Sequence, residues 1–198
     1  MGRKAVDKER KSISEKQLKW VEQLYPKLNE VGLKGLTMNS IAQMMGKSKS
    51  TVYEYFKSKE ELVEATIQFK LSQLAGFEAL LNSSDIEFSK KYLHVMEHVG
   101  AVFSDISTGL LNDIKEYFPA LWIRIEEFID FATGVLENHY REGIENGLYN
   151  DIEPSILVLS DRLFFQAISD PTFLQRQGLT IQDAFDQYLK LKFHGMLK

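Results

Sequence analysis

Apolar residues recur at spacings of three and four along most of this chain, and that periodicity limits its fold more than any other feature. In the first such block, Val21, Leu24 and Leu28 share one side of a helix predicted over about residues 14–30. No stretch alternates between apolar and polar residues as a half-buried strand does. Only four of the 198 residues are prolines. We therefore expect an all-α fold.

Two residues affect the shape and the end of the first predicted helix. Pro26 lies within it and removes a backbone donor, so the helix should kink or break near Tyr25. Gly32 marks its end. Later blocks with the same periodicity predict further helices, at about residues 58–71, 77–81, 86–103, 110–118, 119–146, 154–169 and 180–196.

The most specific local pattern follows the first helix. Thr37 is a suitable N-cap, Gly46 can adopt the positive φ of a sharp helix exit, and Ser48 can cap a second short helix. Val52 and Phe56 then lie four residues apart on the buried side of that second helix. Two short helices joined by a tight glycine turn form a helix-turn-helix.

The net charge of −4 hides an asymmetry along the chain. The first 60 residues hold 13 Lys and Arg against 7 Asp and Glu, a net charge of +6, so the remainder carries −10. A basic end on an acidic body suggests that one end contacts nucleic acid. The alternative is a soluble domain with a solvated basic tail, because residues 1–11 alone hold five of the positive charges.

A helix-turn-helix reads DNA through side chains at the N-terminal end of its second helix, where base edges are reached. Lys49, Ser50 and Thr51 occupy that end, and neighbouring groups could bind phosphates without reading sequence. Structural roles are the alternative, with Ser48 as a helix cap and Tyr55 as a half-buried ring. The residues predicted to contact DNA are Thr37, Lys47, Ser48, Lys49, Ser50, Thr51, Tyr53, Tyr55 and Lys59.

This segment resembles the DNA-binding domain of the TetR/AcrR family of transcriptional regulators. The resemblance covers about residues 19–67, roughly a quarter of the chain. Met45, Lys47 and Ser50 depart from the family pattern, which bears on the DNA sequence that is read rather than on the binding mode. The residues in register with the pattern are Thr37, Ile41, Ala42, Gly46, Ser48, Tyr53, Tyr55, Phe56, Lys59, Glu60 and Leu62.

The resemblance implies an N-terminal three-helix helix-turn-helix DNA-binding domain joined to a larger helical ligand-binding and dimerisation domain. The predicted divisions are a basic N-terminal arm at 1–13, a DNA-binding domain at 14–70 with its helix-turn-helix at 37–56, and a ligand-binding and dimerisation domain at 71–198. The last two predicted helices carry a long apolar pattern, which packing within one chain would explain. In the family this helix pair forms a dimer interface, so we expect a homodimer.

The middle of the chain concentrates aromatic residues, as an apolar ligand site would, although aromatic residues at helical spacing more often form plain core. His94 and His98 lie four apart on one helix face. That spacing permits metal ligation, but without a third ligand they can equally be polar surface or pocket histidines. We expect no metal and no cofactor. The predicted ligand-binding residues are Phe103, Tyr117, Phe118, Trp122, Phe128 and Phe131.

No catalytic pattern stands out, because the sequence has no cysteine, no glycine-rich phosphate loop and no Gly-x-Ser-x-Gly elbow. We do not expect an enzyme. We expect a sequence-specific DNA-binding transcriptional regulator that acts as a homodimeric repressor. A small, largely apolar effector would release it from a palindromic operator. No apolar run is long enough to span a membrane, and we expect a cytoplasmic protein. Two alternatives remain: a helical small-molecule-binding protein with degenerate, non-specific DNA binding, and an all-helical enzyme.

Overall fold

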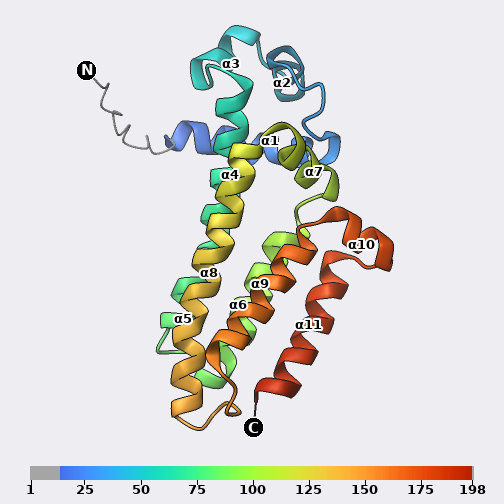
Figure 1. Cartoon of the computed structure of the whole chain (residues 1–198). Helices are drawn as coiled ribbons and strands as arrows, with labels where there is room; N and C mark the ends of the chain where they lie inside the picture. Colours follow the sequence, from blue (N-terminus) through green and yellow to red (C-terminus); the bar gives the residue numbers. More distant parts are fainter. Residues whose placement is uncertain (1–13, 198) are drawn as a thin grey trace, which may run out of the picture.

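The computed structural model describes residues 14–197, apart from the side chains of Pro171 and Gln175. The basic arm predicted for residues 1–13 lies outside this range. Helices make up the fold of the described residues and no strand forms among them, which confirms the all-α prediction (Figure 1). The helices are α1 (Glu15–Val31), α2 (Met38–Met45), α3 (Lys49–Tyr55), α4 (Lys59–Leu74), α5 (Phe77–Asn82), α6 (Phe88–Ser104), α7 (Thr108–Tyr117), α8 (Pro119–Glu145), α9 (Pro154–Ile168), α10 (Pro171–Gln177) and α11 (Ile181–Met196).

Two features of these helices differ from the sequence prediction. The break predicted at Pro26 does not occur, because α1 continues through it to Val31. Pro26 and Glu22 are both exposed, so water can serve the Glu22 carbonyl that lacks its usual helical donor. Helix α10 was not predicted, since its seven residues are too few to show an apolar stripe.

The N-terminal part of the molecule, α1–α4, forms its upper end in Figure 1. There α1 lies across the molecule, α2 and α3 lie above it, and α4 leads downward. The apolar faces of these four helices form one buried cluster, and Leu110, Ile114 and Phe118 from the α7 region belong to the same cluster. The N-terminal part is therefore joined to the rest by side-chain packing as well as by α4.

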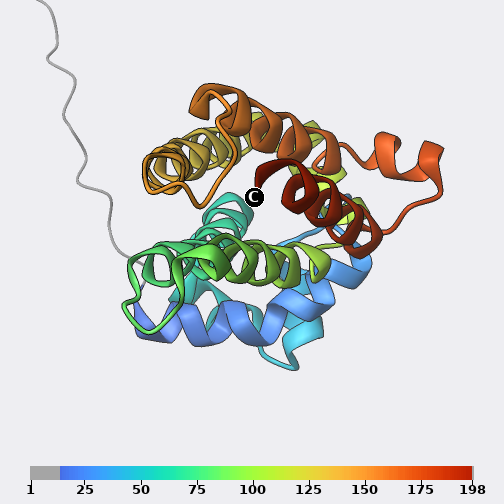
Figure 2. The same ribbon diagram turned by 90° about the horizontal axis from the view of Figure 1, so that it is seen from below.

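The C-terminal part, α5–α11, extends below and has its own apolar cluster. Helix α8 contacts α4 and α9, while α11 packs against α6 and α9. Seen from below, α11 lies between α9 and α6 (Figure 2). None of the helices described between residues 14 and 197 combines the length and apolar character of a membrane span.

A polar cluster lies inside the C-terminal part, centred on Asp161 of α9, which is fully buried. Its carboxylate accepts hydrogen bonds from the hydroxyls of Tyr92 (2.8 Å), Tyr188 (2.7 Å) and Tyr140. The Lys192 ammonium lies 3.0 Å from the same carboxylate. Burial lowers the pKa of Lys192, and the charge of Asp161 opposes that shift. The cluster thus joins α6, α8, α9 and α11 around one ion pair.

Candidate DNA-binding surface and ligand cavity

Helices α2 and α3 form a helix-turn-helix whose turn depends on Gly46. Thr37 Oγ1 accepts a hydrogen bond from the Ser40 N–H at 3.1 Å and caps α2. Gly46 has a φ of 61°, a left-handed conformation that costs other residues about 1–2 kcal/mol. Ser48 Oγ accepts from the Thr51 N–H at 3.1 Å and caps α3. The caps and the glycine turn predicted from the sequence are confirmed.

Burial divides α3 and its flanking residues into an inner and an outer side. Val52 and Phe56 are fully buried in the N-terminal cluster. Lys47, Lys49 and Ser50 are exposed. The first turn of α3 therefore faces solvent while the helix is anchored from behind, at the upper end of the molecule (Figure 1).

The first turn of α3 carries three hydroxyl groups that pair with one another. Ser48 Oγ lies 2.8 Å from Ser50 Oγ and 2.8 Å from Thr51 Oγ1. Lys49 Nζ lies 5.8 Å from the centroid of the Tyr53 ring. Because a hydroxyl both donates and accepts, these groups can exchange their mutual bonds for bonds to a partner. The turn thus offers one ammonium and adaptable hydrogen-bonding groups side by side.

The remaining residues predicted to contact DNA differ in accessibility. Tyr53 is 45% exposed. The Tyr55 ring is half-buried, with its centroid 4.6 Å from that of Trp20. Lys59 is also partly buried, and its ammonium lies 5.5 Å from the Phe118 ring. Tyr53 is therefore freer to meet a phosphate than Tyr55 or Lys59, which also hold the N-terminal part together.

The structure does not gather the six aromatic residues predicted to bind a ligand around one cavity. Phe103 alone among them lines the cavity described next. Helical spacing places the others on different faces, and α7 with the start of α8 packs against the N-terminal part. The other five are the exposed Tyr117 and Phe131, the partly buried Trp122 and Phe128, and Phe118 in the N-terminal cluster.

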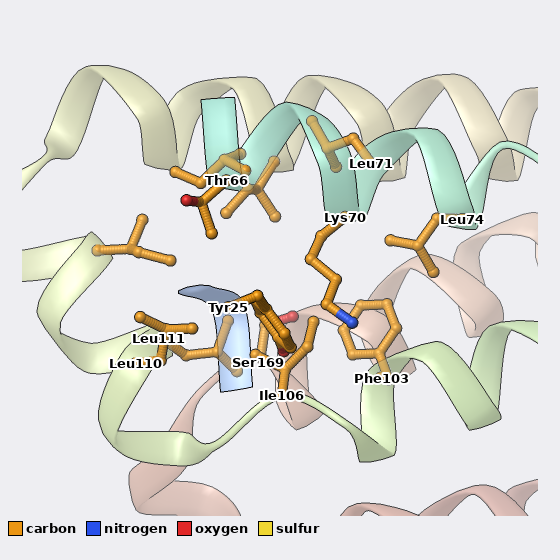
Figure 3. Close-up of a pocket in the computed structure, with 13 residues that line it drawn as sticks. Tyr25, Thr66, Lys70, Leu71, Leu74, Phe103, Ile106, Leu110, Leu111 and Ser169 are labelled. Atoms are coloured by element: carbon orange, nitrogen blue, oxygen red, sulfur yellow. The ribbon is translucent and has the colours of Figure 1, made fainter. Parts of the chain in front are cut away.

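A small cavity lies where the N-terminal and C-terminal parts meet (Figure 3). Residues of α1 and α4 line it together with residues of α6, α7, α8 and the end of α9. Its volume is about 40 Å³, room for only a few water molecules. Sequence reasoning missed it because aliphatic residues from distant helices carry no local pattern. Its polar side chains are Tyr25, Thr66, Lys70 and Ser169.

Beside this cavity, the turn between α6 and α7 is bound to α1 and α4. The Asp105 carbonyl accepts hydrogen bonds from the Tyr25 hydroxyl at 2.7 Å and from Asn29 Nδ2 at 2.8 Å. The Ser107 N–H donates to Asn29 Oδ1 at 2.6 Å, and Lys70 Nζ donates to Asp105 Oδ2 at 2.5 Å. Burial raises the pKa of Tyr25, so its hydroxyl keeps the donated proton. We call this set of bonds the Asp105 junction.

His94 and His98 make separate contacts. His94 Nδ1 lies 3.3 Å from a Glu97 carboxylate oxygen. His98 Nε2 lies 2.9 Å from the Gln73 carbonyl near the end of α4. No group of three side chains able to hold a metal ion occurs in the part of the chain that the structure describes. His98 thus links α6 to α4.

The helix-turn-helix lies in a segment that matches a known protein family. Residues 28–66 match the model of a family described as bacterial regulatory proteins, tetR family. This stretch contains α2, α3 and the first half of α4. The chain is also 22% identical over 161 residues to YvaF of Bacillus subtilis (strain 168), described as an uncharacterized HTH-type transcriptional regulator. That alignment covers 81% of this chain and 85% of YvaF.

Solved structures share the fold over nearly the whole chain. The TetR family regulator PfmR from Thermus thermophilus has a TM-score of 0.66 at 20% identity, covering 89% of this chain and 97% of PfmR. A Saccharomonospora viridis regulator in complex with choline has a TM-score of 0.69 at 14% identity, covering 93% and 98%. At these identities the likeness concerns the fold alone. Residues 28–66 therefore match a tetR-family helix-turn-helix, and the chain as a whole has the fold of the TetR family regulators with which it was compared.

Proposed function

We propose that the protein is a homodimeric repressor that reads a palindromic operator with α3. The observation that carries this proposal is the exposed first turn of α3 above a fully buried inner face. In a major groove, Lys49, Ser50 and Thr51 would reach base edges, because side chains at this end of a recognition helix face the bases. Lys47 and Tyr53 would bind phosphates and fix the register.

In this proposal the DNA-binding domain is residues 14–70, and residues 71–198 bind the second subunit. The effector is bound by residues 71–198 together with cavity residues of α1 and α4. An apolar stripe on α9 supports the dimer. Ile156, Leu159 and Leu163 lie on one face of that helix and are 56%, 48% and 54% exposed in the single chain. Apolar side chains gathered on one exposed helix face are typical of an interaction site. A dimer would supply the two recognition helices that half-sites about 34–36 Å apart require.

Release from the operator would follow from the position of the cavity. Its walls come from both the N-terminal and the C-terminal part, so a molecule inside it contacts both. A small molecule that fits one relative arrangement of the two parts better than another shifts the population toward it. If the favoured arrangement no longer matches the half-site spacing, operator affinity falls.

The experiment is to select binding sites from a random DNA pool with the purified chain, and then to measure affinity for the selected and the scrambled sequence at two salt concentrations. We expect a palindromic consensus whose binding survives the higher salt. Equal binding to both sequences that salt abolishes would leave only the electrostatic attraction of DNA. That result would favour a small-molecule-binding protein with degenerate DNA binding.

A further inference from the structure

Two residues that line the cavity carry buried hydrogen-bond donors. Lys70, on α4, is only 9% exposed, and its ammonium lies 3.9 Å from the centroid of the Tyr25 ring. Ser169, at the end of α9, is 3% exposed, and its hydroxyl finds no hydrogen-bond partner among the described residues. Figure 3 shows both side chains, with Tyr25, among those that line the cavity. A buried hydroxyl without a partner is costly, which favours a ligand that supplies one.

Lys70 can exchange its ion pair with Asp105 for a pair with such a ligand. Its partner Asp105 has a side chain that is 59% exposed, whereas the Lys70 side chain is 11% exposed. Water can therefore solvate the Asp105 carboxylate when the pair opens, so exchanging it for another anion costs little. Lys70 has three N–H donors, and its contact with Asp105 uses one of them.

We propose that the cavity binds a small organic anion, an apolar molecule with one carboxylate. The carboxylate would accept hydrogen bonds from Lys70 and Ser169, and the apolar tail would lie among Leu71, Leu74 and Phe103. Charge-assisted hydrogen bonds of this kind are the strong ones. This proposal rests on the proposed function, since it names the chemical class of the effector.

The size of the cavity connects binding to DNA release. About 40 Å³ is far less than the roughly 300–1,000 Å³ of usual ligand sites, so a carboxylate with a tail must move the cavity walls. Opening the pair between Lys70 and Asp105 also removes the α4 contact from the Asp105 junction. The anion therefore favours an arrangement in which α4 is less firmly held against the turn between α6 and α7.

The test uses matched probes that differ in charge. Octanoate is compared with octanol, and choline serves as a small cation that Lys70 should repel. Binding to the full chain is followed by calorimetry, and release by the loss of fluorescence anisotropy of the selected operator. We expect octanoate to bind about tenfold or more tightly than octanol and to release the operator, since the charged hydrogen bonds are worth at least that factor. Choline should do neither.

Three substitutions separate a direct contact from a structural role. Lys70→Met and Ser169→Ala should weaken octanoate binding about tenfold and about threefold. Ser169→Ala should leave operator affinity without octanoate unchanged, whereas Lys70→Met opens the pair with Asp105 and should lower it. Ser169→Ala breaks no hydrogen bond among the described residues, so it should fold normally. Asp105→Asn removes the competing carboxylate and should tighten octanoate binding. Lys115→Met and Ser72→Ala, both at exposed positions, are the matched controls.

The outcomes distinguish this proposal from the proposed function. Octanol and octanoate binding equally, octanoate not binding at all, or Lys70→Met leaving octanoate affinity unchanged would each overturn the anion site, although the chain still bound its operator. Failure of the wild-type chain to select an operator would instead contradict the proposed function, while the calorimetric comparison of probes would still decide the anion site.

Discussion

Asp161 is a carboxylate with no exposed surface, and its surroundings explain how the chain tolerates it. Three tyrosine hydroxyls and one ammonium are arranged around its two oxygens. Burial raises the pKa of Tyr92 and Tyr140, so both remain donors. A buried charge pair contributes little net stability, but removing one partner leaves the other charge uncompensated.

Asp161→Asn should therefore lower the free energy of unfolding by about 3 kcal/mol, because the buried Lys192 ammonium loses its counter-charge. Urea denaturation followed by circular dichroism measures the change. Asp186→Asn, at an exposed position on α11, is the control and should change stability by less than about 0.5 kcal/mol. An effect of Asp161→Asn as small as the control would show that the carboxylate charge is not needed.

His139 gives the fold a dependence on pH. Its Nε2 lies 2.7 Å from the Tyr149 hydroxyl, and its ring stacks on Phe88 with centroids 4.4 Å apart. Burial lowers its pKa from 6.5 to about 4, so the folded chain keeps it neutral where the unfolded chain takes up a proton. Its contribution to stability is complete above about pH 6.5 and is lost as the pH falls toward 4, by up to about 3 kcal/mol.

The measurement is the free energy of unfolding between pH 7 and pH 4 for the wild type and for His139→Gln. The difference in the free energy of unfolding between the wild type and His139→Gln should change by about 3 kcal/mol between pH 7 and pH 4, because glutamine takes up no proton. A constant difference between wild type and His139→Gln would contradict the assignment.

At the scale of elements, two glycines of α8 should respond in opposite ways to the same substitution. A Cβ at Gly143 would collide with the ring of the buried Tyr149, whereas a Cβ at the exposed Gly134 would meet nothing within 4 Å. Gly143→Ala should thus destabilise the fold by about 2 kcal/mol, and Gly134→Ala should stabilise it by about 1 kcal/mol through helix propensity. The urea concentration at the midpoint of unfolding measures both effects, provided that the dependence of the unfolding free energy on urea is unchanged. Equal effects would show that Tyr149 can move aside.

Local signals predicted the elements well and the cavity poorly. The caps at Thr37 and Ser48 and the turn at Gly46 depend on neighbours within a few residues, so the sequence alone indicates them. Phe103 was the one predicted ligand residue at the cavity. The junction of Lys70 with Asp105 joins residues that are 35 apart, and no periodicity reports such a contact. Sequence patterns describe each helix but not which helices meet.

At the scale of the whole molecule, the apolar stripe of α9 should control the oligomeric state. Leu159→Glu together with Leu163→Glu would place charges in the proposed interface and should produce a monomer with at least about tenfold weaker operator binding. Sedimentation velocity measures the oligomeric state, and fluorescence anisotropy measures the affinity for the operator. Val31→Glu, at an apolar α1 position that is 57% exposed, should leave the dimer intact. A double variant that remained dimeric would place the interface elsewhere.

The central claim is that the first turn of α3 reads DNA sequence, and site selection with altered chains tests it most directly. Replacing both Lys49 and Thr51 with alanine should change the selected consensus, because these side chains would meet base edges. Tyr53→Phe is the control and should weaken binding to all sequences while the consensus stays the same. An unchanged consensus after both replacements would contradict the claim that α3 reads the operator through these residues.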